Sequence, residues 1–578
     1  MKHALWFVLA AALLVRAVPI GHSLPEKYVP DTHVVNGALG MAKSKSLVPP
    51  AGEYTSYPYL LPYLLLPAYV ALYAGGRATG AWSSAEEFGN AIVDDPTAVH
   101  GIARGLVLLF SLLSVVLAYR VGKRAMGRPA AVLAALATAG SFLLVHLSHS
   151  ARPWIPMTAM VLLTAERSLA YARRPTTKRA VQMGIAVGLA AACHQTGALA
   201  VLLPASAALP RIGRTPGRVV KAGIVSAAAF LLTALLTGYP YLLRGAEGGA
   251  VSAPETVDDA VASDKDPEAT EASVGLGGQG FSFESLGTAR LGENALGLLL
   301  AEPVLLLLAL IGLPRGLRRL RDRRCAAVVL VYPVALFLLF LFYAGTHVRY
   351  FAPAVPFLAL FAAVGLRVLW RRPSLRWGAG ALLLLAWSPV VRLDRILLRE
   401  DTRTRMASTI ADVVPAGATI AVEAYGPPLR FGPAAWARLS QDGKWTTRRE
   451  ERQAAGLAAE TPGRPSYDVV PLERYYRFQS VWPHQWLGEG EKPIESFLDE
   501  VGATWLVTSD RTPGGPPNSA LIEVLERRGE RVAVESPSRG DALPAHANLP
   551  MDPPTPWPDV FVVERPGPRL VLWRLRSP

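Results

Sequence analysis

The sequence Tyr28-Val29-Pro30-Asp31-Thr32-His33 and, after a Gly/Ala/Lys/Ser segment, Glu53-Tyr54-Thr55-Ser56-Tyr57-Pro58 form one polar stretch between the first two apolar runs of the chain. A loop that carries carboxylates, a histidine and several tyrosines beside apolar segments costs free energy to order unless it binds a ligand or takes part in chemistry. An ordinary solvated loop is the competing interpretation. The arrangement of the rest of the chain around this stretch favours a functional role.

The composition is that of a polytopic α-helical membrane protein. Of the 578 residues, 51% are hydrophobic, and the mean hydropathy is +0.27, which is too apolar for an ordinary soluble enzyme. The net charge of +14 lies in short clusters between apolar runs, a pattern that argues against a nucleic-acid partner. Cys193 and Cys325 lie within or beside apolar segments, so they provide no disulfide framework.

Apolar runs of spanning or near-spanning length predict about 11–13 transmembrane helices, since a full span needs roughly 20 residues. The first run, 4–20, has no clean cleavage site and is interpreted as an uncleaved span. The runs are 4–20, 58–74, 101–119, 129–147, 153–171, 180–193, 197–210, 219–241, 292–313, 325–344, 350–369 and 377–392.

The connections that are rich in Lys and Arg predict the orientation. They lie within 120–128, 173–179, 211–221, 315–324 and 367–376. The positive-inside rule places these connections in the cytoplasm, and from Gly101 onward the alternation leaves everything after Leu393 outside. The run 58–74 conflicts with this orientation if it is one simple span: either it is re-entrant, or it breaks at Pro62 or Pro67, or the rule fails locally.

The sequence divides at about residue 394 into two domains. Residues 1–394 form the transmembrane domain, with outer loops at 21–57 and 242–291, and residues 395–578 form an extracytoplasmic α/β domain. In the second domain the patterns predict helices at 401–414, 494–501 and 520–528, and strands at 418–424, 504–508, 531–534, 560–563 and 570–573.

Several short motifs, in this order, resemble the bacterial GT-C glycosyltransferases, the superfamily of protein O-mannosyltransferases and aminoarabinose lipid A transferases. The motifs are Pro30-Asp31-Thr32-His33, Tyr57-Pro58, Ala103-Arg104 and Arg349-Tyr350. The resemblance implies an enzyme of the bacterial inner membrane that moves a hexosyl or pentosyl group from a polyprenyl-phosphate donor. The acceptor would be a lipid, a polysaccharide or a protein at the outer face, among membrane lipid.

The sequence also departs from the family pattern. Thr32 stands where members often have a second acid, the outer loop 149–154 lacks an Asp, and His194 replaces a common Lys. These departures keep a second function open, a non-catalytic homologue that binds or transports a lipid-linked sugar. They also leave dependence on a divalent metal ion open, with no other cofactor expected.

Asp31 is the candidate general base that the resemblance implies, because transfer needs a carboxylate to deprotonate or orient the acceptor hydroxyl. The alternative is that Asp31 caps a surface helix over 32–45. Glu53 is a candidate second acid, and Asp31 and Glu53 would be the ligands of a metal ion. His33 is expected to orient the substrate, since no paired ligand at zinc spacing lies near it.

Arg349 is the candidate that binds the donor's phosphate, because a guanidinium can donate two parallel hydrogen bonds to it. His347 and Tyr350 flank it at the outer end of a helix. The alternative is an interfacial arginine that only reaches toward the membrane surface. The other candidate substrate-binding residues are Tyr57, Arg104 and Arg152.

Overall fold

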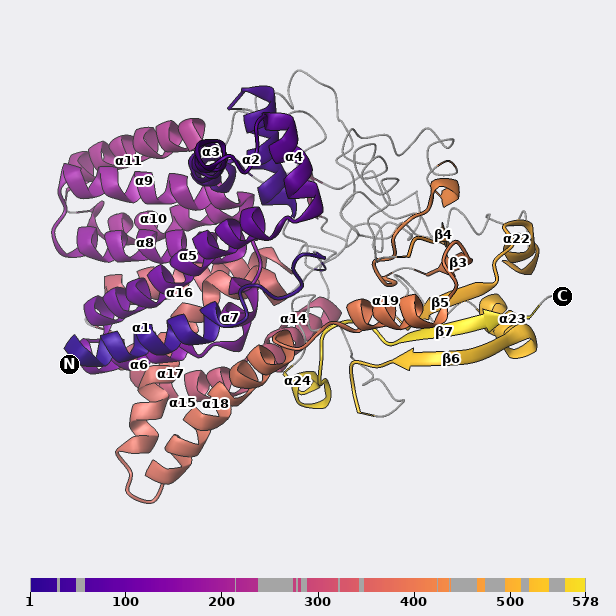
Figure 1. The fold of residues 1–578 in the computed structure, drawn as a ribbon. Coiled ribbons are helices and arrows are strands. Elements are labelled where there is room, and N and C mark those ends of the chain that lie inside the picture. Colours follow the sequence, from indigo (N-terminus) through magenta and orange to yellow (C-terminus); the bar gives the residue numbers. More distant parts are fainter. Residues whose placement is uncertain are drawn as a thin grey trace.

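The chain consists of a helical bundle followed by a smaller α/β domain at one end of it (Figure 1). The structure is a computed structural model. It describes residues 2–26, 28, 32–47, 58–213, 215–237, 274–276, 279–281, 288–320, 323–341, 348–423, 425–435, 437, 465–472, 494–510, 519–539 and 557–576.

In the described residues of the first half of the bundle, all the regular elements are helices. Its helices are α1 (Lys2–Ala17), α2 (Thr32–Ser44), α3 (Leu60–Thr79), α4 (Ala85–Asp94), α5 (Thr97–Ala125), α6 (Arg128–Ala139), α7 (Phe142–Ser148), α8 (Trp154–Arg173), α9 (Thr177–Cys193), η1 (Gln195–Val201), α10 (Leu202–Ala208), η2 (Leu209–Arg211) and α11 (Pro216–Thr237).

The second half begins with a short antiparallel pair of strands, β1 (Val274–Leu276) and β2 (Gln279–Phe281). The helices that follow are α14 (Thr288–Ala301), α15 (Pro303–Arg319), α16 (Arg323–Leu339), η4 (Val348–Ala354), α17 (Val355–Trp370) and α18 (Arg376–Leu397). Because α18 continues to Leu397, the expected domain boundary at residue 394 falls within this helix.

The described residues include several helices that are apolar enough for a membrane. By length and composition, three can cross it: Thr97–Ala125, Pro216–Thr237 and Val348–Trp370. The number rises to five if each of two bent helix pairs counts as one span, Arg128–Ala139 with Phe142–Ser148 and Leu291–Ala301 with Pro303–Arg319. The helices α1 and α16 are apolar but shorter, so the expected 11–13 spans stay a prediction.

Helices α15 and α17 approach each other at two glycines. A Cβ on Gly312 would lie 1.9 Å from the carbonyl oxygen of Phe361, and one on Gly365 would lie 2.0 Å from that of Leu308. Real Cβ atoms do not come so close to backbone atoms, so both positions require glycine. Small residues of this kind let apolar helices pack backbone to backbone.

The run 58–74, expected to be re-entrant or to break at Pro62 or Pro67, forms part of one continuous helix, α3. The expected break is wrong: Pro62 lies in the first turn, where a missing N–H costs little, and Pro67 lies inside the helix. Figure 1 shows α3 close to end-on, whereas α5, α8 and α9 run across the view. The axis of α3 therefore runs across the direction of these three helices.

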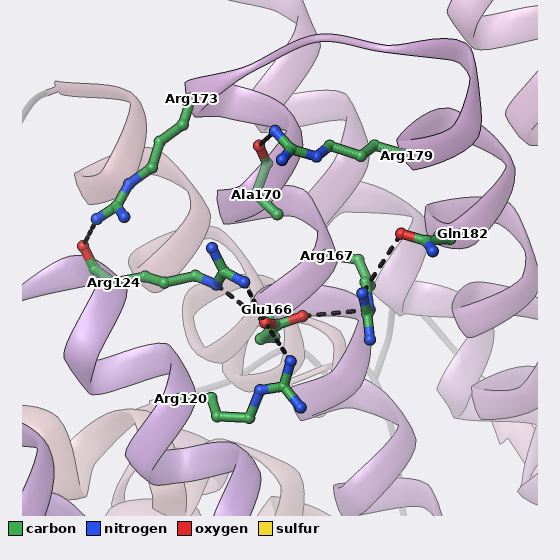
Figure 2. A network of polar contacts seen from close by, with 8 residues as sticks. All are labelled: Arg120, Arg124, Glu166, Arg167, Ala170, Arg173, Arg179 and Gln182. Atoms are coloured by element: carbon green, nitrogen blue, oxygen red, sulfur yellow. Dashed lines mark hydrogen bonds and ion pairs between the residues drawn. The ribbon is translucent and has the colours of Figure 1, made fainter.

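A buried carboxylate joins α5 to α8 near the basic connections (Figure 2). The Oε1 atom of Glu166, on α8, accepts hydrogen bonds from Arg120 at 3.1 Å and from Nη2 of Arg124 at 2.6 Å. Its Oε2 atom lies 3.2 Å from Nε of Arg167. The carboxylate is fully buried, while the three arginine side chains reach solvent.

The α/β domain is built on a mixed sheet of five strands in the order β4-β3-β5-β7-β6. Strand β3 runs parallel to β4 and β5, and β7 runs antiparallel to β5 and β6. The elements are α19 (Thr402–Val413), β3 (Thr419–Val422), β4 (Asp468–Pro471), α22 (Ile494–Glu500), β5 (Trp505–Ser509), α23 (Ser519–Arg528), β6 (Gly529–Glu535), α24 (Asp559–Val562) and β7 (Leu570–Leu575).

Alternate residues of the strands enter two separate cores. Ile420 and Val422 of β3 pack with Met406 and Ile410 of α19, while Ala421 packs with residues of α22 and α23. The sheet therefore has α19 on one face and α22 with α23 on the other, as the period of two along a strand requires.

The strand expected at 560–563 is wrong, because residues 559–562 form the short helix α24. Val560 and Val563 are buried while Phe561 and Val562 are exposed, which is the three-residue spacing of a helix face. The buried pair packs on Val390 and Leu393 of α18, so the chain returns to the bundle before β7.

Candidate functional site

Three irregular segments of the bundle meet around Trp154, the first residue of α8. They are the turn before α8, the break between α9 and η1, and the 3-10 helix η4. The ring of Trp154 lies 4.5 Å from that of His194 and 4.9 Å from that of Tyr350, between centroids. Tyr350 also stacks on Phe340 at 4.9 Å. We call Trp154, His194, Phe340, Arg349 and Tyr350 the aromatic cluster.

Arg349 is the cation of this cluster. Its Cζ atom lies 5.5 Å from the ring centroid of Tyr350 and 6.0 Å from that of Trp154, and the residue is only 7% exposed. Both distances fall in the range of cation–π contacts, which strengthen when water is excluded. The aromatic faces thus stabilise a buried positive charge in an otherwise apolar part of the bundle.

His194 interrupts the helical path between α9 and η1. Its extended backbone (φ −158°, ψ 147°) ends α9, and its Nδ1 atom accepts the backbone N–H of Thr196 at 3.2 Å. Burial and, to a smaller extent, the nearby Arg349 guanidinium together lower the pKa of His194 to about 3. The imidazole is therefore neutral and leaves Arg349 as the charged group of the aromatic cluster.

A second polar cluster joins the end of α1 to α5, α6 and α7. Arg16 donates to Ser111 Oγ at 2.7 Å and to the carbonyl oxygen of Ala139 at 2.9 Å. His149 Nε2 lies 3.1 Å from the carbonyl oxygen of Val15 and 3.9 Å from Asp394 of α18. These contacts satisfy buried polar groups between helices, the role expected of such residues inside a membrane domain.

Four predicted site residues lie outside the described residues, and they include both catalytic candidates, Asp31 and Glu53. The other two are Tyr57 and His347, and for His33 only the backbone is described, in α2. The predicted helix over 32–45 is confirmed as α2. Among the residues that the structure describes, no group of three or more His, Cys, Asp or Glu side chains could hold a metal ion. The predicted metal ligands, Asp31 and Glu53, are therefore not tested.

The other predicted binding residues differ in their surroundings. Arg349 and Tyr350 come together in the aromatic cluster. Arg104 is fully buried, and its Nη1 atom donates to the carbonyl oxygens of Ile20 and His22 at 2.8 and 2.7 Å. These contacts hold the turn after α1 against α5. Arg152 is partly buried in the turn before α8.

Sequence reasoning missed Trp154 and Phe340 as members of the site and treated His194 only as a departure from the family pattern. The available signal was the position of His194 between two glycine-rich apolar runs, where an irregular backbone is tolerated if it lines a protein interior. No sequence pattern relates Trp154 to Arg349, because their contact depends on how distant helices pack.

One family model matches part of the chain. Residues 98–237, from α5 to α11, match the model for dolichyl-phosphate-mannose-protein mannosyltransferase. The match confirms, over this segment, the predicted resemblance to the GT-C glycosyltransferases. No curated protein sequence matches the chain.

Solved structures of membrane glycosyltransferases are similar to the chain at low identity. ArnT from Cupriavidus metallidurans, bound to undecaprenyl phosphate, is 12% identical over 98% of this chain and 97% of that one, with a TM-score of 0.44. The Archaeoglobus fulgidus oligosaccharyltransferase with an acceptor peptide is 12% identical over 88% and 69%, with a TM-score of 0.43. The arabinofuranosyltransferase AftD from mycobacteria is 16% identical over 100% of this chain and 40% of that one, with a TM-score of 0.42.

Proposed function

We propose that this protein is an integral-membrane glycosyltransferase that transfers a sugar from a polyprenyl-phosphate donor to an acceptor at the outer membrane face. The observation that carries the proposal is the buried Arg349 in the aromatic cluster, at the meeting point of two broken helices. The family match over residues 98–237 supports the reaction class. The bound undecaprenyl phosphate of ArnT is consistent with the class of donor.

In the proposed chemistry, different residues act on the acceptor and on the leaving phosphate. The acceptor oxygen attacks the anomeric carbon, the bond from that carbon to the phosphate oxygen breaks, and polyprenyl phosphate leaves. Asp31 takes the acceptor proton as general base. Arg349 stabilises the negative charge that develops on the departing phosphate.

The proposal includes the finer features expected from the sequence. The bundle has about 11–13 transmembrane segments, consistent with roughly 20 residues per span, and lies in a bacterial inner membrane with residues 395–578 outside. The sugar is a hexose or a pentose, and the acceptor is a lipid, a polysaccharide or a protein. A divalent ion, if one takes part, is held by Asp31 and Glu53.

Intact-lipid mass spectrometry of cells with and without the gene tests the function. Cells without it should lack a glycosylated envelope component and accumulate the lipid-linked donor. The purified protein should then convert that donor and release polyprenyl phosphate. Tight donor binding with no turnover would instead identify the non-catalytic binding homologue that Thr32 and the acid-free loop 149–154 leave open.

Asp31→Asn tests the proposed base directly. The variant should fold, insert and bind the donor normally, while transfer falls by about 10²-fold or more, the scale of a positioned general base. Asp95→Asn provides a matched control, because Asp95 only accepts the backbone N–H of Thr97 before α5, at an exposed position. Wild-type turnover by Asp31→Asn with a purified lipid donor would refute the role.

A further inference from the structure

The first helix of the α/β domain begins with a buried ion pair that the proposed reaction does not use. Arg403 donates from Nε to Oδ1 of Asp401 and from Nη2 to Oδ2, both at 2.8 Å. Asp401 also accepts the backbone N–H of Arg403 and so caps α19. Both residues are nearly fully buried, and the bidentate geometry fixes the plane of the guanidinium.

Tyr28, the first residue of the polar stretch that opens the sequence, lies on this guanidinium. The Cζ atom of Arg403 is 3.8 Å from the ring centroid of Tyr28, a close cation–π contact. The Tyr28 hydroxyl lies 3.0 Å from Oγ1 of Thr404, one residue further along α19. A single side chain of the N-terminal part is therefore held by two consecutive residues of the α/β domain.

The start of α19, which contacts Tyr28, is also held by the segment before β7. The backbone N–H of Thr402 donates to the carbonyl oxygen of Pro566 at 3.0 Å, and its Oγ1 donates to that of Pro568 at 2.7 Å. Gly567 lies between them with φ +104°, and a Cβ there would lie 2.0 Å from Oγ1 of Thr402. Because the segment before β7 fits α19 so closely, Arg403 cannot shift without disturbing the sheet.

The chain after Tyr28 is anchored on the other side by the bundle. Helix α2 starts at Thr32, and its Val34, Val35 and Ala38 pack into one core with α3 and α5. The segment from Tyr28 to Thr32 therefore starts at a contact with the α/β domain and ends at a contact with the bundle.

We propose that Tyr28 and Arg403 form a clasp through which the α/β domain positions the first outer segment of the bundle. Both are positioning residues, and neither touches the reacting atoms. The inference deepens the proposed function, on which it rests, because the same segment carries the proposed base Asp31. Through this clasp the α/β domain would contribute to sugar transfer by fixing the position of the segment that carries Asp31.

Variants of Tyr28 test the clasp without leaving a buried charge unpaired, because the ion pair between Asp401 and Arg403 remains. Tyr28→Leu should lower kcat for transfer about tenfold, the fold-change of a partly desolvated cation–π contact, with the KM for the donor unchanged. Tyr28→Phe keeps the aromatic face and loses only the hydrogen bond with the Thr404 hydroxyl, so its kcat should lie within about twofold of the wild-type value. Arg405→Gln is the control on the same helix as Arg403: it breaks a partly exposed pair with Glu535 of β6 and should leave kcat unchanged.

Hydrogen–deuterium exchange of the full chain in detergent tests the contact without relying on activity. The first turn of α2 should exchange faster in Tyr28→Leu than in the wild type, Tyr28→Phe or Arg405→Gln. If faster exchange occurs in a protein that transfers no sugar, the clasp stands and the proposed function fails. Unchanged exchange in α2, or a wild-type kcat for Tyr28→Leu in an active enzyme, would overturn the clasp.

Discussion

At the scale of single residues, replacing Arg349 by lysine distinguishes a guanidinium that binds phosphate through two parallel hydrogen bonds from one that supplies only a positive charge. Arg349→Lys keeps the charge but loses the two parallel donors, so affinity for the polyprenyl-phosphate sugar donor should weaken by about 1–3 kcal/mol, roughly tenfold to a hundredfold. Arg349→Ala should cost more. Donor affinity is measured by titration of the purified variants.

Arg376→Lys is the matched control for this comparison. Arg376 also lies over an aromatic ring, with Cζ 5.5 Å from the centroid of Trp377, but both residues are exposed at the start of α18. Its replacement should leave donor binding unchanged. An unchanged affinity for Arg349→Lys, with normal stability, would assign Arg349 to a structural role in the aromatic cluster.

Individual residues of the site were predictable only where a local pattern marks them. Arg349 and Tyr350 stand out because they precede Pro353 and Pro356 at the start of an apolar run. Trp154 carries no such mark, since a tryptophan at the start of an apolar helix is common at membrane interfaces. Its place beside Arg349 follows from the packing of α8 against η4, which one sequence does not encode locally.

At the scale of elements, Glu166 decides how α5 is held against α8. Glu166→Gln removes the carboxylate that Arg120, Arg124 and Arg167 contact in Figure 2 and leaves their charges to repel one another. The free energy of unfolding should fall by about 3 kcal/mol, the lower end of the range for breaking a buried pair, because the arginines reach solvent. Titration with a denaturing detergent measures this change.

Glu495→Gln is the control for the loss of a paired carboxylate at the surface. Glu495 is also contacted by two arginines, Arg527 and Arg528, but it lies at a partly exposed position. Its replacement should cost about 0–1 kcal/mol. Equal destabilisation by the two variants would contradict the importance of burial at Glu166.

Glu423 joins β3 to β5 and should make the α/β domain sensitive to pH. Its Oε2 atom accepts the backbone N–H of Ser509 at 2.7 Å. Burial raises the pKa of Glu423 from 4.5 to about 7; the Ser509 hydrogen bond opposes the rise and Asp510 adds to it. Between these values the folded state binds more protons than the unfolded state, so stability should fall by about 1–3 kcal/mol as pH rises from about 4.5 through 7.

The comparison of Glu423→Gln with the wild type isolates this effect. The amide oxygen can still accept from Ser509 but does not titrate, so the variant should lose the decline between these pH values. Thermal unfolding of the full chain at a series of pH values measures the difference. Glu523→Gln, at an exposed position on α23, should keep the wild-type pH dependence; an identical decline in Glu423→Gln would exclude this carboxyl as its source.

Most element types of the α/β domain were predictable, but the type at 560–563 was not. The expected strands at 418–424, 504–508, 531–534 and 570–573 are confirmed as β3, β5, β6 and β7. The expected helices at 401–414, 494–501 and 520–528 are confirmed as α19, α22 and α23. Residues 560–563 were misassigned because a run of four apolar or aromatic residues fits a strand as well as a helical turn. Pro558 before the turn and Asp559 in its first position are the local signals that favour the helix.

At the scale of the whole molecule, the bundle has two chemically different ends. The basic connection between α17 and α18 lies at the end away from the α/β domain (Figure 1). Single cysteines in a variant without Cys193 and Cys325 should therefore be shielded from an impermeant thiol reagent in intact cells when placed in 120–128, 173–179 or 315–324. Cysteines in 255–285 or after residue 400 should react, as the positive-inside rule requires.

Labelling of the basic connections in intact cells would overturn this orientation, and with it an outward-facing site. The same labelling after cell disruption is the control, because every position should then react. The orientation is a prediction from charge alone, whereas the direction of α3 in the bundle could not be predicted from the sequence. A run of apolar residues has the same hydropathy whether its helix runs parallel to the neighbouring helices or perpendicular to them.

The contact between α24 and α18 can form only late in the synthesis of this protein. Arg392 donates to the carbonyl oxygen of Val560, 168 residues later in the chain, at 3.2 Å, and Val560 covers Val390 and Leu393. At about 5–20 residues per second, a ribosome needs roughly 10–30 s to make the partner of α18 after α18 itself has emerged. During that interval the apolar surface at the C-terminal end of α18 lacks the cover of α24, and exposed apolar surface of this kind makes incomplete chains prone to aggregate.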